Sequence, residues 1–528
     1  MRHDLLILFF ILLSSALMAD EHSNEAPSFK VQGIVTDEKE GLPGASVWVK
    51  GTVVGAGTNA KGEFSFKLSS KNRCVLRVSF TGYEPQEREV TPGVDSLYHF
   101  VLEPSNNALN EVVITGTRTL KPLKDVPVLT RVISSEDIAQ VNPLDLQSLL
   151  EYEMPGLQFG LAHGSGLPEL KFQGSAGGYV LFMIDGERVA GEGSSNNIDY
   201  NLIDMDNVER IEIVKGPMST LYGSQAMGGV VNIITKDANR PFTGNVSVRY
   251  GNNDESKYSL SLGTKQGRFS ALTSLSYRKR DAYALKDKEG QIEYSYYKDI
   301  YGRDSVVADT SEKGMSSVNG FEIWQANQKL SYTFNENFRI SLNGAYYNND
   351  VLEYVEQKEQ DRFSNYSINP RVYYAINDSH ILDFSYVFEN YEKRYVYTTS
   401  LPSKKVFGDL TNTVRLNYTG YIHEKHTLTA GIEVNTQKLQ HYWFDNGSGK
   451  KFDAQTYVLY LQEDYKVSDS FSVLAGVRSD CHSKYGFHAS PKISLMYKYG
   501  VLTLRGGYGM GFRIPSLKES SSRLGYRA

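Results

Sequence analysis

Histidine and acidic residues are the side chains of this chain that could carry out catalysis or bind a metal, and their spacing argues against both. His423, Glu424 and His426 stand one residue closer together than the histidines and glutamate of a zinc-protease helix, and they fall in a predicted turn. The polar segment His22-Ser23-Asn24-Glu25 offers two zinc ligands without a third. We therefore expect no enzyme, no cofactor and no metal centre.

Glycines 507, 509 and 511 have the spacing of a nucleotide-binding loop but lie on a predicted strand that no helix follows. The formal net charge of -5 gives no basic surface for nucleic acid. The two cysteines, Cys74 and Cys481, lie far apart in the sequence, and we expect them to be unpaired. A length of 528 residues predicts several domains.

The N-terminus has the pattern of a secretory signal peptide, which we assign to residues 1–19. Arg2 and His3 precede an apolar run from Leu5 to Leu13, and small residues follow it. That run is too short to span a membrane, and beyond it no apolar run of about 18 residues occurs. Any later entry into a membrane must therefore use strands.

The stretch from Gly174 to Lys236 is the element that the rest of the chain must position. It predicts strands at Leu181 to Ile184, Val208 to Val214 and Val230 to Ile234, with one helical turn from Ser219 to Tyr222. Dense glycine punctuation between such short strands indicates a globule with little core of its own, which needs a surrounding wall.

The pattern Val-Glu-Arg-Ile-Glu-Ile-Val-Lys-Gly-Pro-x-Ser-x-Leu-Tyr-Gly-Ser-x-Ala-x-Gly-Gly-Val-Val-Asn-Ile-Ile-Thr-Lys resembles the plug of TonB-dependent outer-membrane receptors. The resemblance implies a plug domain over residues 125–236, which begins with a strand from Val128 to Ile133. Ser134 should cap the helix that follows, with Asp137 three residues on.

Residues 29–103 alternate between apolar and polar side chains over short stretches separated by glycine turns, which predicts a small β-sandwich. The phrases Gly-x-Pro-Gly-Ala-x-Val-x-Val-Lys-Gly-Thr and Val-Ser-Phe-Thr-Gly-Tyr resemble the carboxypeptidase-regulatory-like domain that precedes many such receptors. That family name implies no peptidase here.

A short apolar segment between the sandwich and the plug, residues 109–117, resembles the TonB box. Flexible polar flanks and an extended apolar core suit pairing with the sheet edge of a partner; the alternative is an ordinary linker strand. The residues assigned to the box are Glu111, Val112, Val113, Ile114, Thr115, Gly116 and Thr117.

From Pro241 onward the chain predicts long strands with an apolar and a polar face. Phe338, Ile340 and Leu342 share one face, while Arg339 and Ser341 lie on the other. We count about 13 strands, joined by tight turns that alternate with mostly longer loops, which is typical of an outer-membrane barrel. Residues 242–513 form this predicted barrel.

The predicted fold is therefore mainly β: an N-terminal β-sandwich, an α+β plug, and a transmembrane antiparallel β-barrel with about 13 of the family's 22 strands. Residues 509–519 resemble the Phe-Arg-x-Pro box of heme, siderophore and cobalamin receptors, with Ile514 where Ala is usual. Residues 514–528 lack the aromatic final strand of a complete barrel, and we expect a truncated product.

The resemblance implies import of a scarce ligand across the outer membrane, where TonB, with its ExbB and ExbD energy supply, pulls on the box. The expected ligand is an iron complex, heme or cobalamin; the expected surroundings are outer-membrane lipid, with a surface lipoprotein as a further candidate partner. The alternatives are a SusC-like glycan importer and a non-transporting surface-binding protein. Candidate ligand-binding residues are His163, His441, His482, Phe512 and Arg513.

Glu209, Arg210 and Glu212 are the candidates for ion pairs that lock the plug to the wall, because charged residues inside a barrel can pair in a confined space. The alternative is that these are solvated charges on a strand.

Overall fold

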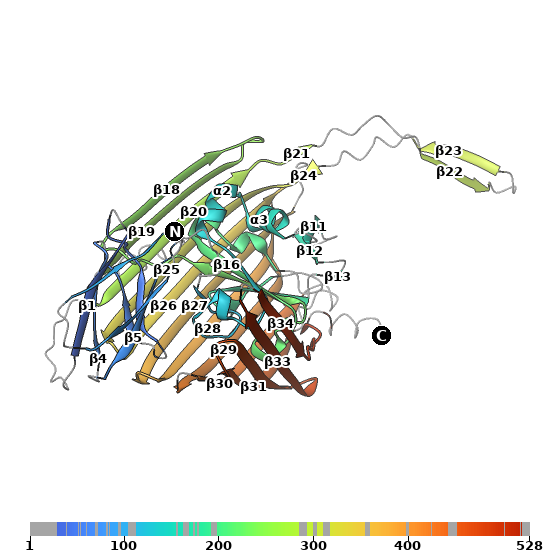
Figure 1. Cartoon of the computed structure of the whole chain (residues 1–528). Helices are drawn as coiled ribbons and strands as arrows, with labels where there is room; N and C mark the ends of the chain where they lie inside the picture. Colours follow the sequence, from blue (N-terminus) through green and yellow to red (C-terminus); the bar gives the residue numbers. More distant parts are fainter. Residues whose placement is uncertain are drawn as a thin grey trace.

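The structure is a computed structural model, and it places three units along the chain (Figure 1). They are a two-sheet sandwich, a mixed α and β domain, and one long antiparallel sheet. The residues described are 29–519, apart from 38–39, 51, 53, 60, 69–71, 81–82, 84, 93–96, 104–111, 155–156, 162–167, 173–174, 177–178, 192–197, 285–292, 299–303, 310–316, 354–358, 398–400, 424, 442–450, 501 and 518.

The sandwich forms because each of its strands has one apolar face. In β4, Phe64, Phe66 and Leu68 are buried and alternate with Glu63, Ser65 and Lys67. One sheet has the order β4-β1-β7 and the other β3-β2-β5-β6. The bounds are β1 (Phe29–Thr36), β2 (Ser46–Val49), β3 (Gly55–Gly57), β4 (Glu63–Leu68), β5 (Cys74–Ser79), β6 (Gln86–Val90) and β7 (Tyr98–Val101).

The mixed domain, residues 112–236, is called the plug below. Its central sheet has the order β10-β16-β17-β14-β15, in which β14 runs parallel to β17 and the other pairs are antiparallel. The strands are β10 (Thr130–Ile133), β14 (Val180–Ile184), β15 (Glu187–Arg188), β16 (Val208–Lys215) and β17 (Gly229–Thr235). The plug sheet thus contains the strands that the sequence predicts, within one or two residues.

The helices of the plug also follow their sequence signals. Ser134 and Asp137 form the expected capping box at the start of α2 (Ser135–Val141). Helix α3 (Leu146–Glu153) buries Leu146, Leu149 and Leu150 against the sheet, and α4 (Ser219–Tyr222) is the predicted single turn. The short elements are η2 (Leu123–Asp125), η5 (Tyr200–Leu202), η6 (Met205–Asn207), β8 (Val112–Val113), β9 (Lys121–Pro122), β11 (Leu157–Leu161), β12 (Pro168–Phe172) and β13 (Ser175–Ala176).

The long sheet, called the wall below, has 13 strands in sequence order. They are β18 (Thr243–Tyr250), β19 (Ser256–Gln266), β20 (Phe269–Arg280), β25 (Gly320–Asn335), β26 (Phe338–Leu352), β27 (Glu359–Asn377), β28 (His380–Tyr397), β29 (Lys404–Ile422), β30 (His426–His441), β31 (Lys451–Lys466), β32 (Phe471–His482), β33 (Gly486–Tyr499) and β34 (Leu502–Gly509). Two small hairpins lie between β20 and β25: β21 (Tyr283–Ala284) with β24 (Ser317–Val318), and β22 (Glu293–Lys298) with β23 (Asp304–Asp309). The predicted strand number is confirmed, but the two hairpins were not predicted.

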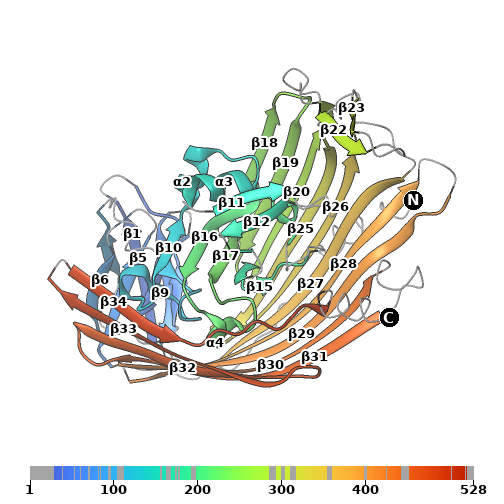
Figure 2. The same ribbon diagram turned by 90° about the vertical axis from the view of Figure 1, so that its right-hand side faces the viewer.

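The wall curves around one side of the plug (Figure 2). Its buried inner face carries polar side chains and its exposed outer face carries apolar ones, the reverse of a sheet in a soluble protein. On β33, Lys492 and Ser494 are buried on the side that faces the plug, whereas Ile493 and Leu495 are about two-fifths exposed on the outside. The predicted fold class is confirmed. Within the described residues the wall is not closed, since β18 and β34 pair only with β19 and β33.

The last strand of the wall, β34, ends at Gly509, because the chain then turns inward over the plug. The Met510 N–H donates to the Pro491 carbonyl at 3.0 Å, and the Ile514 N–H donates to Ser224 Oγ of the plug at 2.9 Å. Leu517 is buried among Tyr391, Phe407 and other apolar residues of the wall.

The sandwich lies at the end of the wall where the tight turns are (Figure 1). The Lys67 N–H donates to Glu336 Oε1, in the turn between β25 and β26, at 3.1 Å. In the part of the chain that the structure describes, no helix is long and apolar enough to cross a bilayer.

A charge on the outer face of the wall should destabilise the protein in a bilayer. Leu459, in the middle of β31, is 60% exposed on that face. We expect Leu459→Arg to lower the free energy of unfolding in lipid vesicles by about 2–4 kcal/mol, because the guanidinium must leave water. The control Leu459→Ile should match the wild type in the same urea titration; an arginine variant of wild-type stability would contradict the orientation of the wall.

Candidate functional site

The segment predicted to be a TonB box is held inside the plug by a buried carboxylate. Glu212 on β16 and Thr115 both have no solvent exposure. Glu212 Oε2 accepts hydrogen bonds from the Ile114 N–H at 3.0 Å, the Thr115 N–H at 2.8 Å and the Thr115 hydroxyl at 2.7 Å. A carboxylate that accepts from two neighbouring backbone N–H groups fixes the backbone itself and not only a side chain.

Two further plug residues complete the contacts of Thr115. Asn232, which is opposite Glu212 in the β16 and β17 ladder, donates to Thr115 Oγ1 at 3.0 Å. The Tyr222 hydroxyl donates to the Thr115 carbonyl at 3.0 Å. Burial raises the pKa of Tyr222 to about 12, so the hydroxyl keeps its proton and remains a donor. Thr115 is therefore anchored through its N–H, its hydroxyl and its carbonyl.

The residues after the anchor connect the segment to the wall. Gln462 of β31 donates to the Thr117 carbonyl at 2.9 Å. Arg118 donates to the Tyr460 hydroxyl at 2.5 Å and to the Leu221 carbonyl at the end of α4 at 2.7 Å. Its guanidinium also stacks on the rings of Tyr222 and Tyr460, at 4.8 and 4.6 Å from their centroids. One short segment thus joins plug and wall.

The structure divides the predicted box into two parts. Val112 and Val113 form β8, a two-residue strand paired with β9, and Glu111 lies outside the described residues. Ile114 to Thr117 form a turn, in which Thr115 and Thr117 are buried. Within the described part of the box, Val112 and Val113 have the extended conformation that strand addition requires, and residues 114–117 do not.

The predicted lock residues pair within the plug. Arg210 lies 2.9 Å from Glu212 and 3.5 Å from Glu209, both on its own strand, and Arg210 Nε donates to Glu212 Oε1. Arg210 therefore supports the charge of the Glu212 anchor. The ion pairs between plug and wall come from other residues, which sequence reasoning missed because pairs so distant in sequence leave no local signal.

Those ion pairs surround the plug. Lys257 of β19, 4% exposed, lies 2.7 Å from Asp204 and 2.9 Å from Asp206. Further pairs are Arg249 with Asp206, Arg415 with Glu187, Lys329 with Asp185, Lys121 with Asp464 and Lys498 with Asp125. Buried Asp199 accepts from the hydroxyls of Tyr347 at 2.7 Å and Tyr391 at 3.1 Å. Charged and polar contacts of this kind can reform after the plug moves, whereas an apolar seal would expose apolar surface.

The candidate ligand residues do not form one cluster. His163 lies outside the described residues. His441 is buried against the ring of Phe407, and His482 Nδ1 accepts from the Lys484 N–H at 3.1 Å; strand β31 separates the two histidines. Within the described residues, no group of three or more His, Cys, Asp or Glu side chains is arranged to hold a metal ion.

Phe512 and Arg513 lie on the segment that turns inward after β34. The Phe512 ring stacks on His488 of β33 at 5.1 Å with an interplanar angle of 9°. Arg513 pairs with Glu519 at 2.5 Å and lies over the ring of Tyr179 at 5.6 Å. These contacts order the segment where it crosses the plug.

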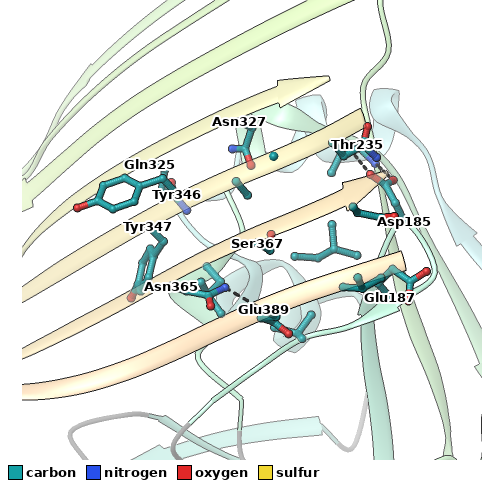
Figure 3. A pocket seen from close by; sticks show the side chains of 18 of the residues that line it. Asp185, Glu187, Thr235, Gln325, Asn327, Tyr346, Tyr347, Asn365, Ser367 and Glu389 are labelled. Carbon is teal, nitrogen blue, oxygen red and sulfur yellow. Dashed lines mark hydrogen bonds between the residues drawn. The ribbon is translucent and has the colours of Figure 1, made fainter. Parts of the chain in front are cut away.

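A cavity of about 130 Å³ lies between the plug turn at Asp185 and strands β25 to β28 (Figure 3). The wall lines it with neutral amide side chains, among them Gln325, Asn327, Asn365 and Asn369. Asn365 donates to Glu389 at 3.0 Å, while the side-chain oxygens of Asn365 and Asn369 have no protein partner. The sequence signal that could have identified this lining is the polar residue at every second position of these strands.

Glu212 can be tested against its neighbour Glu209. Glu212→Ala should free the 114–115 backbone, because it removes charge-assisted bonds worth about 1.5–3 kcal/mol each. We expect hydrogen exchange of the Ile114 and Thr115 amides to accelerate by roughly 30- to 150-fold for a loss of about 2–3 kcal/mol. Glu209→Ala is the matched control, because its carboxylate is about half exposed and bonds only to Arg210. Equal protection in both variants would refute the anchor.

The ion pairs of Asp206 predict that the free energy of unfolding decreases in acid. Burial alone would raise the pKa of Asp206, but Lys257 and Arg249 outweigh this effect and hold the pKa below the ordinary value of 3.8. The stabilisation is therefore present above about pH 4 and is lost as the pH falls through the lowered pKa. We expect unfolding free energies measured from pH 6 to pH 2.5 to decrease less steeply for Asp206→Asn than for the wild type. Identical slopes would contradict this assignment.

Comparisons with known proteins agree with this arrangement. The TonB-dependent receptor plug domain matches residues 122–230, the CarboxypepD_reg-like domain matches residues 31–114, and the TonB-dependent receptor-like β-barrel matches residues 251–526. The chain is 25% identical over 432 residues to the iron-regulated outer membrane virulence protein of Vibrio cholerae, covering 77% of this chain and 60% of that relative. It is 26% identical over 419 residues to the vitamin B12 transporter BtuB of Vibrio vulnificus, covering 77% and 64%.

Solved structures show the same fold. A mutant of the ferric enterobactin receptor PfeA from Pseudomonas aeruginosa superposes with a TM-score of 0.60 at 19% identity, covering 74% of this chain and 62% of the receptor. The siderophore receptor PirA from the same species gives 0.54 at 20% identity, covering 74% and 62%. The chain thus spans less than two thirds of the length of these proteins. Because the β-barrel family alone matches just over half of the 528 residues, the chain belongs to the TonB-dependent receptors of the outer membrane.

Proposed function

We propose that the protein serves in TonB-dependent import of a scarce ligand, an iron complex, heme or cobalamin, across the outer membrane. The observation that carries the proposal is the box segment anchored on buried Glu212, inside a plug that lies against the curved wall. Similarity to an iron-regulated protein, a vitamin B12 transporter and a ferric enterobactin receptor supports the ligand class. TonB with ExbB and ExbD, and a surface lipoprotein, are the partners proposed with it.

The anchor suggests how force from TonB would act. TonB would add a strand to the part of the box that ends at Val113 and pull toward the cell interior. The pull would first load the bonds between Glu212 and the 114–115 backbone, then the wall contacts of Arg118. Beyond these lies β10, an edge strand of the plug sheet that pairs only with β16 and is therefore the first strand that can be peeled away.

A second candidate function, import of a glycan, is supported by the neutral cavity between the plug and β25 to β28. Its amide side chains can both donate to and accept from hydroxyl groups. The charged residues of the lining are three acids, Asp185, Glu187 and Glu389, and two bases, Arg188 and Lys329, so the lining offers no excess positive charge for an anionic ligand.

The box assignment can be tested separately from the anchor. Deletion of residues 109–113 from a complete receptor that carries this sequence should abolish uptake and leave binding intact, because Glu212 keeps its bonds to residues 114 and 115. Uptake and binding would be measured with iron-55 siderophores, heme, cyanocobalamin and a labelled oligosaccharide. Replacing residues 104–108 is the control and should be neutral.

Retained uptake after the deletion would overturn the box assignment. Uptake of the oligosaccharide, with none of the iron or cobalamin ligands taken up, would favour the second candidate.

A further inference from the structure

A seam lies where strand β33 meets helix α4 and residues 509–511. It is rich in hydrogen-bond donors, and its lysine, Lys492, has no carboxylate partner among the described residues. Ser490 and Lys492 project inward from β33 and are 1% and 8% exposed. Ser219 of α4 is 1% exposed. These residues belong to a wall strand and a plug helix that contact each other.

Lys492 is a buried cation without a counter-charge. Its Nζ contacts Met218 Sδ at 2.8 Å, and thioether sulfur is only a weak acceptor. Among the ion pairs of the described residues, none includes Lys492. Lys498 on the same face of the same strand pairs with Asp125 at 2.5 Å. An ammonium group removed from water without an anion is costly, so a partner for Lys492 is expected.

Two hydroxyl groups at the seam are also unpaired. Ser219 Oγ and Ser490 Oγ are buried and have no hydrogen-bond partner. The elements that carry them are in contact, because the Thr220 hydroxyl donates to the Ser490 carbonyl at 2.9 Å. A buried hydroxyl that makes no hydrogen bond costs about 1–3 kcal/mol, and two of them beside one unpaired lysine indicate a shared missing acceptor.

The inward-turning segment forms the third side of the seam. Gly509 is opposite Lys492 in the β33 and β34 ladder. A Cβ atom at Gly511 would lie 2.9 Å from Met227 Cγ and 3.3 Å from Ser219 Oγ, so the backbone approaches α4 too closely for a larger residue. The seam is thus bounded by β33, α4 and the inward-turning segment.

We propose that this seam binds one small inorganic anion, such as chloride, held by the Lys492 ammonium and the hydroxyls of Ser219 and Ser490. The anion neutralises Lys492 and gives both hydroxyls an acceptor. It joins the plug, the wall and the inward-turning segment at one point. The site goes beyond import itself, because it is occupied whether or not a transported ligand is bound.

The test compares thermal unfolding of the purified chain in detergent across a series of sodium chloride concentrations, with sodium gluconate holding the ionic strength constant. The wild-type Tm should rise with chloride, because an anion that binds only the folded state stabilises it. Lys492→Met, which keeps the side-chain length, should remove the response. Lys498→Met is the matched control and should keep it, because that lysine already has a carboxylate partner.

If Lys492→Met fails to fold, Ser490→Ala tests the same site. We expect it to weaken the apparent chloride affinity about tenfold, as for the loss of one bond to a charged group. Crystals soaked in bromide should show anomalous density within hydrogen-bonding distance of Lys492 Nζ. A wild-type Tm independent of chloride, an unchanged response in both variants, or absent bromide density would overturn the proposal.

Discussion

The bonds between Glu212 and the backbone of Ile114 and Thr115 are the interaction on which the account of this protein rests. Glu212 is fully buried, and Arg210 on the same strand supports its charge. The acceptor comes from β16, an interior strand of the plug sheet, so residues 114 and 115 of the predicted box cannot leave without breaking their bonds to the Glu212 side chain. The predicted box is thereby tied to the central sheet of the plug, which lies against the curved wall.

The wall holds the plug mainly through polar and charged contacts. Its outward face is largely apolar and its inward face largely polar, so the plug meets many hydrogen-bonding and charged groups beside apolar contacts such as that of Leu474. Lys257, Arg415 and Lys498 each hold a plug carboxylate across the interface. Contacts of this kind give a specific resting position and can be exchanged for water or for other partners when the plug moves.

Much of the fold could be predicted from the sequence because its signals are local. The alternation at Lys492, Ile493 and Ser494 predicts the inside and the outside of the wall, and the capping box at Ser134 predicts the start of α2. The candidate site was less accessible. Glu212 was identified as a charged residue of interest, but its partner at Thr115 lies 97 positions away and no local pattern points to it. The end of β34 at Gly509 depends on contacts with the plug, which the strand pattern does not contain.

Mechanical unfolding of a single molecule tests the central claim most directly. One handle would be attached just before residue 112 and the other would hold the wall in a lipid nanodisc. We predict a first step at low force that releases about 70–80 Å of chain, the extended length of residues 112 to 133, while the wall stays folded. The same step should need less force in Glu212→Ala. Plug and wall that unfold together in one step, or a first step that does not depend on Glu212, would contradict the account.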